Sequence, residues 1–121
     1  MTEEEVLGYV SATITSVWAL QALILLRTDP RRAWPKNLLV RELRGSHLAI
    51  DEALTSLRNA GLVVQDSEGM FRLAPASADL GEFVDNVAEV YATKPVSVIR
   101  SIANSANEKL RIFSNAFRFK E

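Results

Sequence analysis

The chain is 121 residues long, 48% hydrophobic and 24% charged, which is typical of one folded domain and not of a disordered or fibrous chain. The absence of cysteine excludes disulfides, zinc–thiolate sites and thiol nucleophiles, and the net charge of −1 gives no overall attraction to nucleic acid. The start of the chain is acidic, unlike an export signal, and no apolar run approaches the roughly 20 residues that span a bilayer, so we expect a cytoplasmic protein without membrane spans.

A long first helix is predicted to end at Asp29-Pro30. The capping box Thr2-x-x-Glu5 precedes apolar residues at near-helical spacing. Gly8 weakens the first turns by about 1 kcal/mol relative to alanine. The helix is therefore expected either to bend or to begin later, near Ser11 or Ser16.

Two further helices are predicted on either side of a tight turn. Pro35 suits the first position of a short helix that stops at Arg44-Gly45. Ser46 is a good N-cap for the third helix, and Gly61 supplies a left-handed residue at its end. The apolar positions of this third helix recur at three and four residues, namely Ile50, Ala53, Leu54 and Leu57.

A β-hairpin is predicted directly after the third helix. The β-prone runs 62–66 and 70–74 flank a loop that contains Gly69, and Pro75 ends the second run. No other part of the sequence has a strand pattern, so the expected class is mainly α with a small β-hairpin.

The C-terminal part of the chain is predicted to be helical. A fourth helix, with Ser77 as its cap, carries apolar residues at helical spacing and ends at Lys94-Pro95. A fifth helix follows through residues 98–103, and the capping box Ser105-x-x-Glu108 begins a sixth. Neither a repeat nor a flexible linker interrupts the chain, so residues 1–121 are expected to form a single domain.

The residues between positions 17 and 75 carry a resemblance to a known family. The matching features are Trp34-Pro35 ahead of the second helix, Leu39 and Leu43 within it, Leu54-x-x-Leu57-x-x-x-Gly61-Leu62-Val63 at the end of the third, and the hairpin from Val64 to Leu73. In these features the chain resembles winged helix-turn-helix transcriptional regulators of the MarR-like and ArsR-like kind. The resemblance implies a winged-helix core at 17–75, flanked by helices in 1–16 and 76–121.

The same resemblance implies a DNA-binding transcriptional regulator. In such proteins the third helix enters the major groove, and the hairpin, called the wing, reaches a neighbouring groove or the backbone. The candidates for phosphate contacts are Lys36, Arg41 and Arg44. The further candidates, on the third helix and the wing, are Ser46, His47, Thr55, Arg58 and Arg72.

The distribution of charge leaves a second function open. Residues 27–58 carry seven bases against four acids, whereas residues 59–93 carry one base against six acids. Asp51 and Glu52 are expected on the outer face of the third helix, where a carboxylate could accept from cytosine N4 but is unfavourable near phosphates. The alternative is a winged-helix protein-protein interaction module, whose acidic residues over 66–89 bind a basic, transcription-related partner.

No catalytic, cofactor or metal site is indicated by the sequence. Ser46, His47 and Asp51 lie at the start of one helix and cannot easily converge as nucleophile, base and orienting acid. One histidine without cysteine offers no metal-ligand spacing, and the single glycines match no phosphate-binding loop. We therefore expect neither an enzyme nor a bound cofactor.

The first helix is apolar on more than one face and needs more cover than two short helices and a hairpin provide. The C-terminal helices can supply this cover, or a second copy can supply it across a two-fold axis, as in the related regulators. We expect a homodimer. The aromatic end from Phe113 to Lys120 is expected to anchor within the chain, with an exposed patch for a partner protein as the alternative. The sequence also leaves open an apolar effector pocket between the first and the C-terminal helices.

Overall fold

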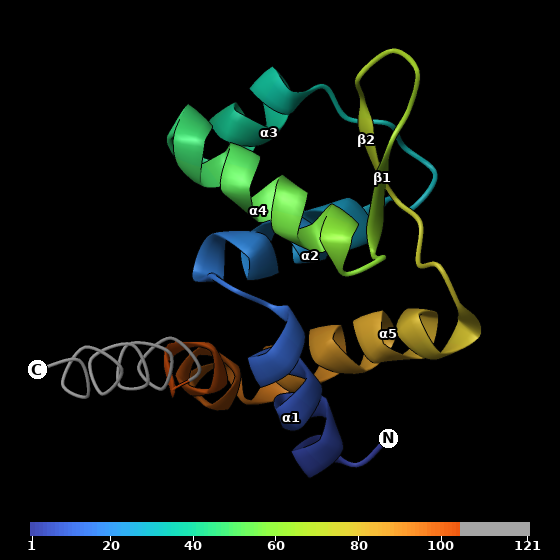
Figure 1. The fold of residues 1–121 in the computed structure, drawn as a ribbon. Helices are drawn as coiled ribbons and strands as arrows, with labels where there is room; N and C mark the ends of the chain where they lie inside the picture. The colour runs from blue at the N-terminus through green and yellow to red at the C-terminus, as the bar shows by residue number, and fades with distance from the viewer. Residues whose placement is uncertain (105–121) are drawn as a thin grey trace, which may run out of the picture.

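The computed structural model describes residues 1–104, which are mainly helical with one small antiparallel sheet (Figure 1). In chain order the elements are α1 (Glu3–Thr13), α2 (Val17–Thr28), α3 (Lys36–Leu43), α4 (His47–Asn59), β1 (Val63–Gln65), β2 (Phe71–Leu73) and α5 (Ala78–Thr93). Residues 95–104 are also helical. The predicted sixth helix from Ser105 and the aromatic end of the chain lie outside the described residues.

The long first helix of the sequence analysis is two helices, α1 and α2, bent by 115° relative to each other. Thr2 caps α1, as predicted, and accepts from the Glu5 amide at 3.2 Å. Ser16 is extended and caps α2 by accepting from the Ala19 amide at 3.0 Å. The later start near Ser16 is therefore correct for α2, because a serine side chain competes for the amides that a continuous helix would use.

The predicted pair of helices around a tight turn is present as α3 and α4. Pro35 precedes α3, and Arg44 ends it in the left-handed conformation with φ of 56°. Ser46 caps α4, as predicted, and accepts from the Ala49 amide at 3.0 Å. A side chain at Gly45 would approach both Ile50 and Trp18 to about 3 Å, so this turn is closely packed against α2 and α4.

The predicted hairpin is confirmed, with β1 antiparallel to β2 and Val63 opposite Leu73. Gly61 turns the chain into it with φ of +77°, a conformation that costs a residue with a side chain. The backbone of Trp34 pairs with Phe71 through two hydrogen bonds of 2.7 and 2.8 Å. These bonds attach the segment before α3 to the hairpin.

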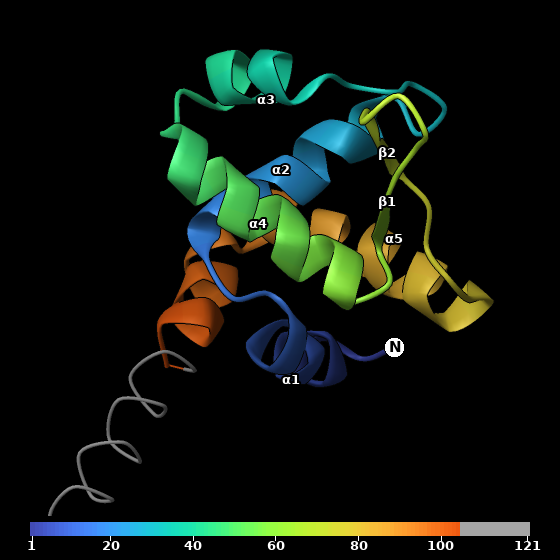
Figure 2. The same cartoon turned by 45° about the horizontal axis from the view of Figure 1, so that its top comes forward.

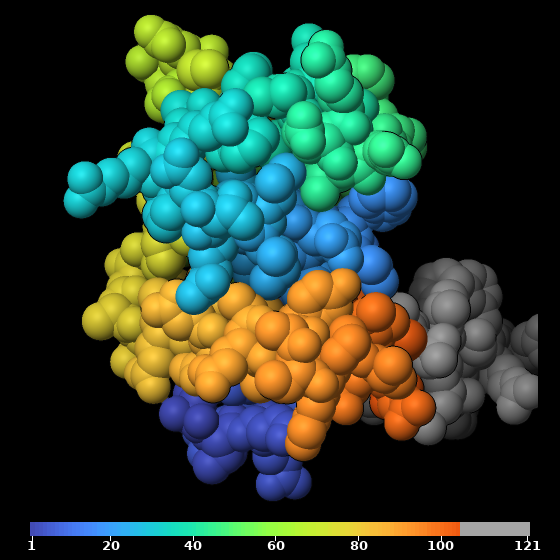
Figure 3. Space-filling view, turned by 180° about the vertical axis from the view of Figure 1, so that it is seen from behind, coloured from blue at the N-terminus to red at the C-terminus, as the bar shows by residue number. Residues whose placement is uncertain are grey.

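The helices α1, α5 and 95–104 lie together on one side of the α2, α3, α4 and hairpin unit (Figures 1 and 2). Seen from behind, α5 crosses the molecule between α1 and the region of α2 (Figure 3). One contiguous core joins the two parts, with Val10, Leu23 and Val87 among its fully buried members. Among the described residues no single helix is long and apolar enough to cross a membrane, and α1 with α2 would meet that test only as a sharply bent pair.

Candidate nucleic-acid interface

One face of α4 is buried and the other is exposed. Ile50, Ala53, Leu54 and Leu57 are buried on the side that packs against α2 and α3. Most polar residues of α4 lie on the exposed side, together with one large apolar residue, and the exposed set is His47, Leu48, Asp51, Glu52, Thr55, Arg58 and Asn59. The helix therefore presents a continuous outer face to solvent, as the sequence predicted.

Two arginines flank the start of α4. Arg41 lies in the last turn of α3 and Arg44 at its left-handed end, and both side chains are exposed. Within residues 1–104 neither of them forms an ion pair. Ser46 has a local role because its hydroxyl caps α4. His47, at the first position of α4, follows Ser46 and is also exposed.

The predicted contacts Lys36 and Arg58 are held by neighbouring side chains. The Lys36 ammonium lies 3.0 Å from a carboxylate oxygen of Asp51, and Arg58 donates to the side-chain oxygen of Gln65 at 3.0 Å. Lys36 and Arg58 both line a groove of about 380 Å³ between α4 and the hairpin, together with Thr55. The Lys36–Asp51 pair reduces the negative charge of the outer face of α4.

Arg72 does not join this group of residues. On β2 it alternates with the buried residues Phe71 and Leu73, so it shares the outer face of the hairpin with its cross-strand partner Val64. Gln65, which accepts from α4, is paired with Phe71 on the opposite face. Arg72 is therefore placed for a contact on the far side of the hairpin from α4.

The acidic residue at the start of the hairpin loop has a structural role. The Asp66 carboxylate accepts from the amides of Glu68 and Met70 at 2.9 and 3.0 Å, and Gly69 closes the loop with φ of +82°. This is the geometry of a three-residue hairpin loop with a left-handed glycine. Glu68 is exposed and makes no ion pair within residues 1–104.

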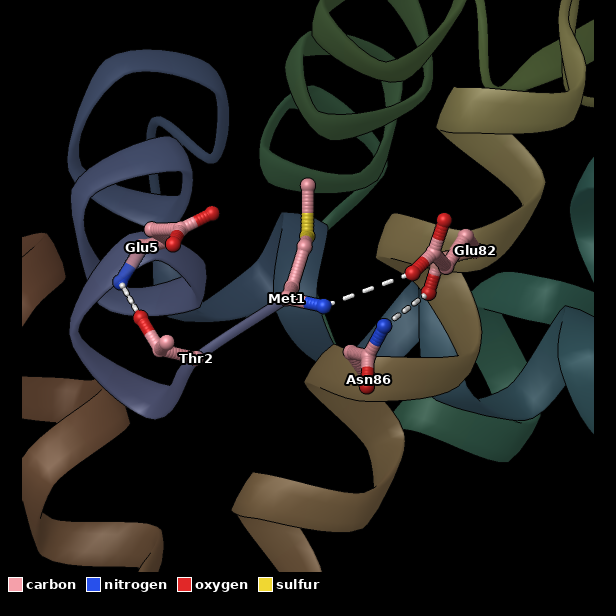
Figure 4. A network of polar contacts seen from close by, with 5 residues as sticks. All are labelled: Met1, Thr2, Glu5, Glu82 and Asn86. Atoms are coloured by element: carbon pink, nitrogen blue, oxygen red, sulfur yellow. Dashed lines mark hydrogen bonds and ion pairs between the residues drawn. The ribbon is translucent and has the colours of Figure 1, made fainter.

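Several other charges are engaged within the chain. Arg27 of α2 pairs with Asp85 of α5 at 3.1 Å, and the guanidinium of Arg32 lies 3.8 Å from the ring centre of Trp34. The N-terminal amine of Met1 lies 3.4 Å from a carboxylate oxygen of Glu82 on α5 (Figure 4). Part of the acidic surface expected over 66–89 is thus neutralised internally.

A groove of about 700 Å³ runs between α1 and residues 51–59 of α4. Tyr9 and Thr13 line its α1 side, Glu52 and Asn59 line its α4 side, and Leu80 of α5 lines it as well. The Thr15 hydroxyl donates to Ser56 at 2.9 Å and links the two walls. This hollow was not expected from sequence, and it involves α4 as well as the helices between which an effector pocket was left open.

Within residues 1–104 no group of three or more histidine, aspartate or glutamate side chains is arranged to hold a metal ion. Of the eight predicted site residues, seven lie on or beside the outer face of α3 and α4, and Arg72 lies apart. Leu48 was not among them, although its outward place follows from the helical spacing of the buried residues. Comparisons with protein-family models, curated proteins and solved structures found no match for this chain.

Proposed function

We propose that this protein is a winged-helix transcriptional regulator that binds duplex DNA, with α4 in the major groove and the hairpin as its wing. The observation that carries the proposal is the exposed face of α4, which follows a closely packed turn and is flanked by Arg41 and Arg44, two arginines that form no ion pair within residues 1–104. Such a helix fits the major groove, which is wide enough to admit it. Arg41 and Arg44 are exposed beside the start of α4, and in this proposal they contact the backbone phosphates.

The interaction-module alternative has weaker support in the described residues. It requires a free acidic surface over residues 66–89. Asp66 is hydrogen-bonded in its own loop, and Glu82 and Asp85 are paired with Met1 and Arg27. Three of the six acidic residues of this region thus serve contacts within the chain, whereas Arg41 and Arg44 beside α4 form no ion pair within residues 1–104.

A homodimer is the second part of the proposal. On the helix at 95–104, Val98 and Ile102 are buried in the core, while Val96 and Ile99 on another face are 64% and 38% exposed. An exposed apolar face of this kind is suited to a second copy. Light scattering coupled to size exclusion is expected to give twice the chain mass, and the Val96→Asp/Ile99→Asp variant is expected to give the chain mass. A monomeric wild-type protein would contradict this part alone.

The DNA proposal is tested by titrating a random-sequence duplex at low salt. Replacing two phosphate contacts weakens binding to all sequences and makes the negative slope of log affinity against log salt shallower by about 2. We expect this result for Arg41→Ala/Arg44→Ala. The control of equal charge change is Arg27→Ala/Arg100→Ala, which removes one arginine from α2, where it pairs with Asp85 of α5, and one from the helix at 95–104.

Two results would overturn the DNA proposal. One is no detectable binding of wild-type protein to the duplex at low salt, which would favour the interaction-module alternative. The other is an equal loss of affinity in both double variants, which would mean that net charge and not the surface beside α4 attracts the duplex.

A further inference from the structure

We propose that Leu48 and Glu52 determine sequence specificity, Leu48 by contact with the C5-methyl group of a thymine and Glu52 by accepting from the N4 amino group of a cytosine. This inference rests on the proposed function and specifies two bases that the bound duplex must contain. The two residues differ from the basic residues beside α4, because neither an apolar nor an acidic side chain attracts phosphate. On a helix that enters the major groove, they suit the edges of base pairs.

Leu48 is 67% exposed although it belongs to a helix with a well-packed inner face. It lies in the first turn of α4, and the first residues of a recognition helix are those that reach base edges. The Ser46 cap and the close packing at Gly45 hold this turn in place. An exposed apolar side chain on this turn matches the thymine methyl group, the one apolar group in the major groove.

Glu52 lies one turn after Leu48, on the same face of α4. Its carboxylate forms no ion pair within residues 1–104, whereas the neighbouring Asp51 is held by Lys36 at 3.0 Å. An ionised carboxylate only accepts hydrogen bonds. In the major groove cytosine presents only its N4 amino group, which is a hydrogen-bond donor. Adenine presents its N6 amino group beside the N7 acceptor, which a carboxylate cannot hydrogen-bond, so cytosine is the better partner for Glu52.

The spacing of the two side chains restricts the sequence that both can contact. Residues four apart on a helix have Cβ atoms about 5–6 Å apart. Successive base pairs are about 3.4 Å apart along the duplex axis. Both contacts can therefore be made together when the thymine and the cytosine belong to adjacent base pairs or to pairs two steps apart.

The test begins with duplexes selected from a random library by the full-length protein. In the best duplex each thymine is replaced in turn by deoxyuridine, which differs only in lacking the methyl group. We expect one replacement to weaken binding by wild-type protein about fourfold, the effect of one buried methyl group. The Leu48→Ala variant is expected to bind the thymine and deoxyuridine duplexes equally.

The carboxylate is tested with Glu52→Gln on duplexes that carry each of the four bases at the selected cytosine. The amide also donates hydrogen bonds, so we expect the preference for cytosine to fall about tenfold or more. Glu89→Gln on α5 is the matched control, because it removes the same charge from an exposed helical position elsewhere. Both α4 variants should melt at the wild-type temperature, since their side chains are exposed.

The outcomes separate this inference from the function on which it rests. If no duplex is enriched or bound at low salt, the DNA proposal itself fails. If duplexes are bound but wild-type protein tolerates every deoxyuridine, or if Glu52→Gln keeps the cytosine preference, the assignment of these two residues is wrong while the function stands. If Leu48→Ala retains the response to deoxyuridine, another residue contacts the methyl group.

Discussion

The two sides of the molecule use their charges differently. On the side of α1 and α5, charged groups far apart in sequence pair with each other, as in Glu3 with Lys94 at 2.8 Å. On the side of α3 and α4, Lys36 pairs with Asp51, but Arg41, Arg44 and Glu52 form no ion pair within residues 1–104. Charges that hold helices together cannot also bind a partner freely, so the second side is the better candidate for an interface.

Substitutions in the core are expected to have the largest effect on stability, and they test whether the two sides unfold as one unit. Leu57 of α4 and Val10 of α1 are both 0% exposed in one contiguous core. Leu57→Ala is expected to lower the free energy of unfolding by about 2–5 kcal/mol, and Val10→Ala by about 2 kcal/mol. Urea unfolding followed by circular dichroism and by tryptophan fluorescence should give coincident transitions in each variant. Separate transitions in Val10→Ala would show that α1 and α5 unfold independently.

A pair of glycines, one on each side, should respond to alanine in opposite directions. Gly61 has φ of +77°, and an added Cβ would lie 3.3 Å from Ala76 and Leu80, so Gly61→Ala should destabilise by about 1–2 kcal/mol. Gly8 lies in α1 with nothing within 4 Å of an added Cβ, so Gly8→Ala should stabilise by about 0.5–1 kcal/mol. Thermal melts measure both. A stabilising Gly61→Ala would contradict a left-handed turn at this position.

Substitutions at Ser46 distinguish a structural role of its hydroxyl from a contact with DNA. Its hydroxyl accepts from the Ala49 amide, so Ser46→Ala should lower the free energy of unfolding by about 1 kcal/mol. Ser46→Asn keeps a capping oxygen and should restore stability in denaturant titrations. If Ser46→Asn is stable but binds duplex DNA more weakly, the hydroxyl also contacts DNA.

The smallest effect concerns the ion pair between Glu3 and Lys94. Both side chains are about half exposed, and such pairs contribute about 0–1 kcal/mol. Lys94→Ala should therefore lower the melting temperature slightly at low salt and not at high salt, because salt screens exposed charges. Arg100→Ala is the control, since Arg100 has no ion pair within residues 1–104. A large loss that persists at high salt would mean that the lysine stem packs against α1.

Local chemistry was sufficient to predict much of the candidate surface. The Ser46 cap, the left-handed Gly61 and the spacing of Ile50, Leu54 and Leu57 together predict which face of α4 is buried and which is exposed. The groove between α1 and α4 could not be predicted in this way. It depends on the angle at which α1 leaves α2, and no pattern within either helix encodes that angle.

The sequence by itself determined most helix ends from Pro35 onward and the reversal at Gly61, because caps, glycine conformations and apolar spacing act over a few residues. It left open whether residues 3–28 form one bent helix or a later-starting one, and the structure has two helices there. Only the tertiary structure decided which charges remain free. Lys36 pairs with Asp51, Arg58 contacts Gln65 and Arg72 lies on the far face of the hairpin. Such pairings depend on distances of a few ångströms between elements that are separate in sequence, and composition and net charge carry no information about them.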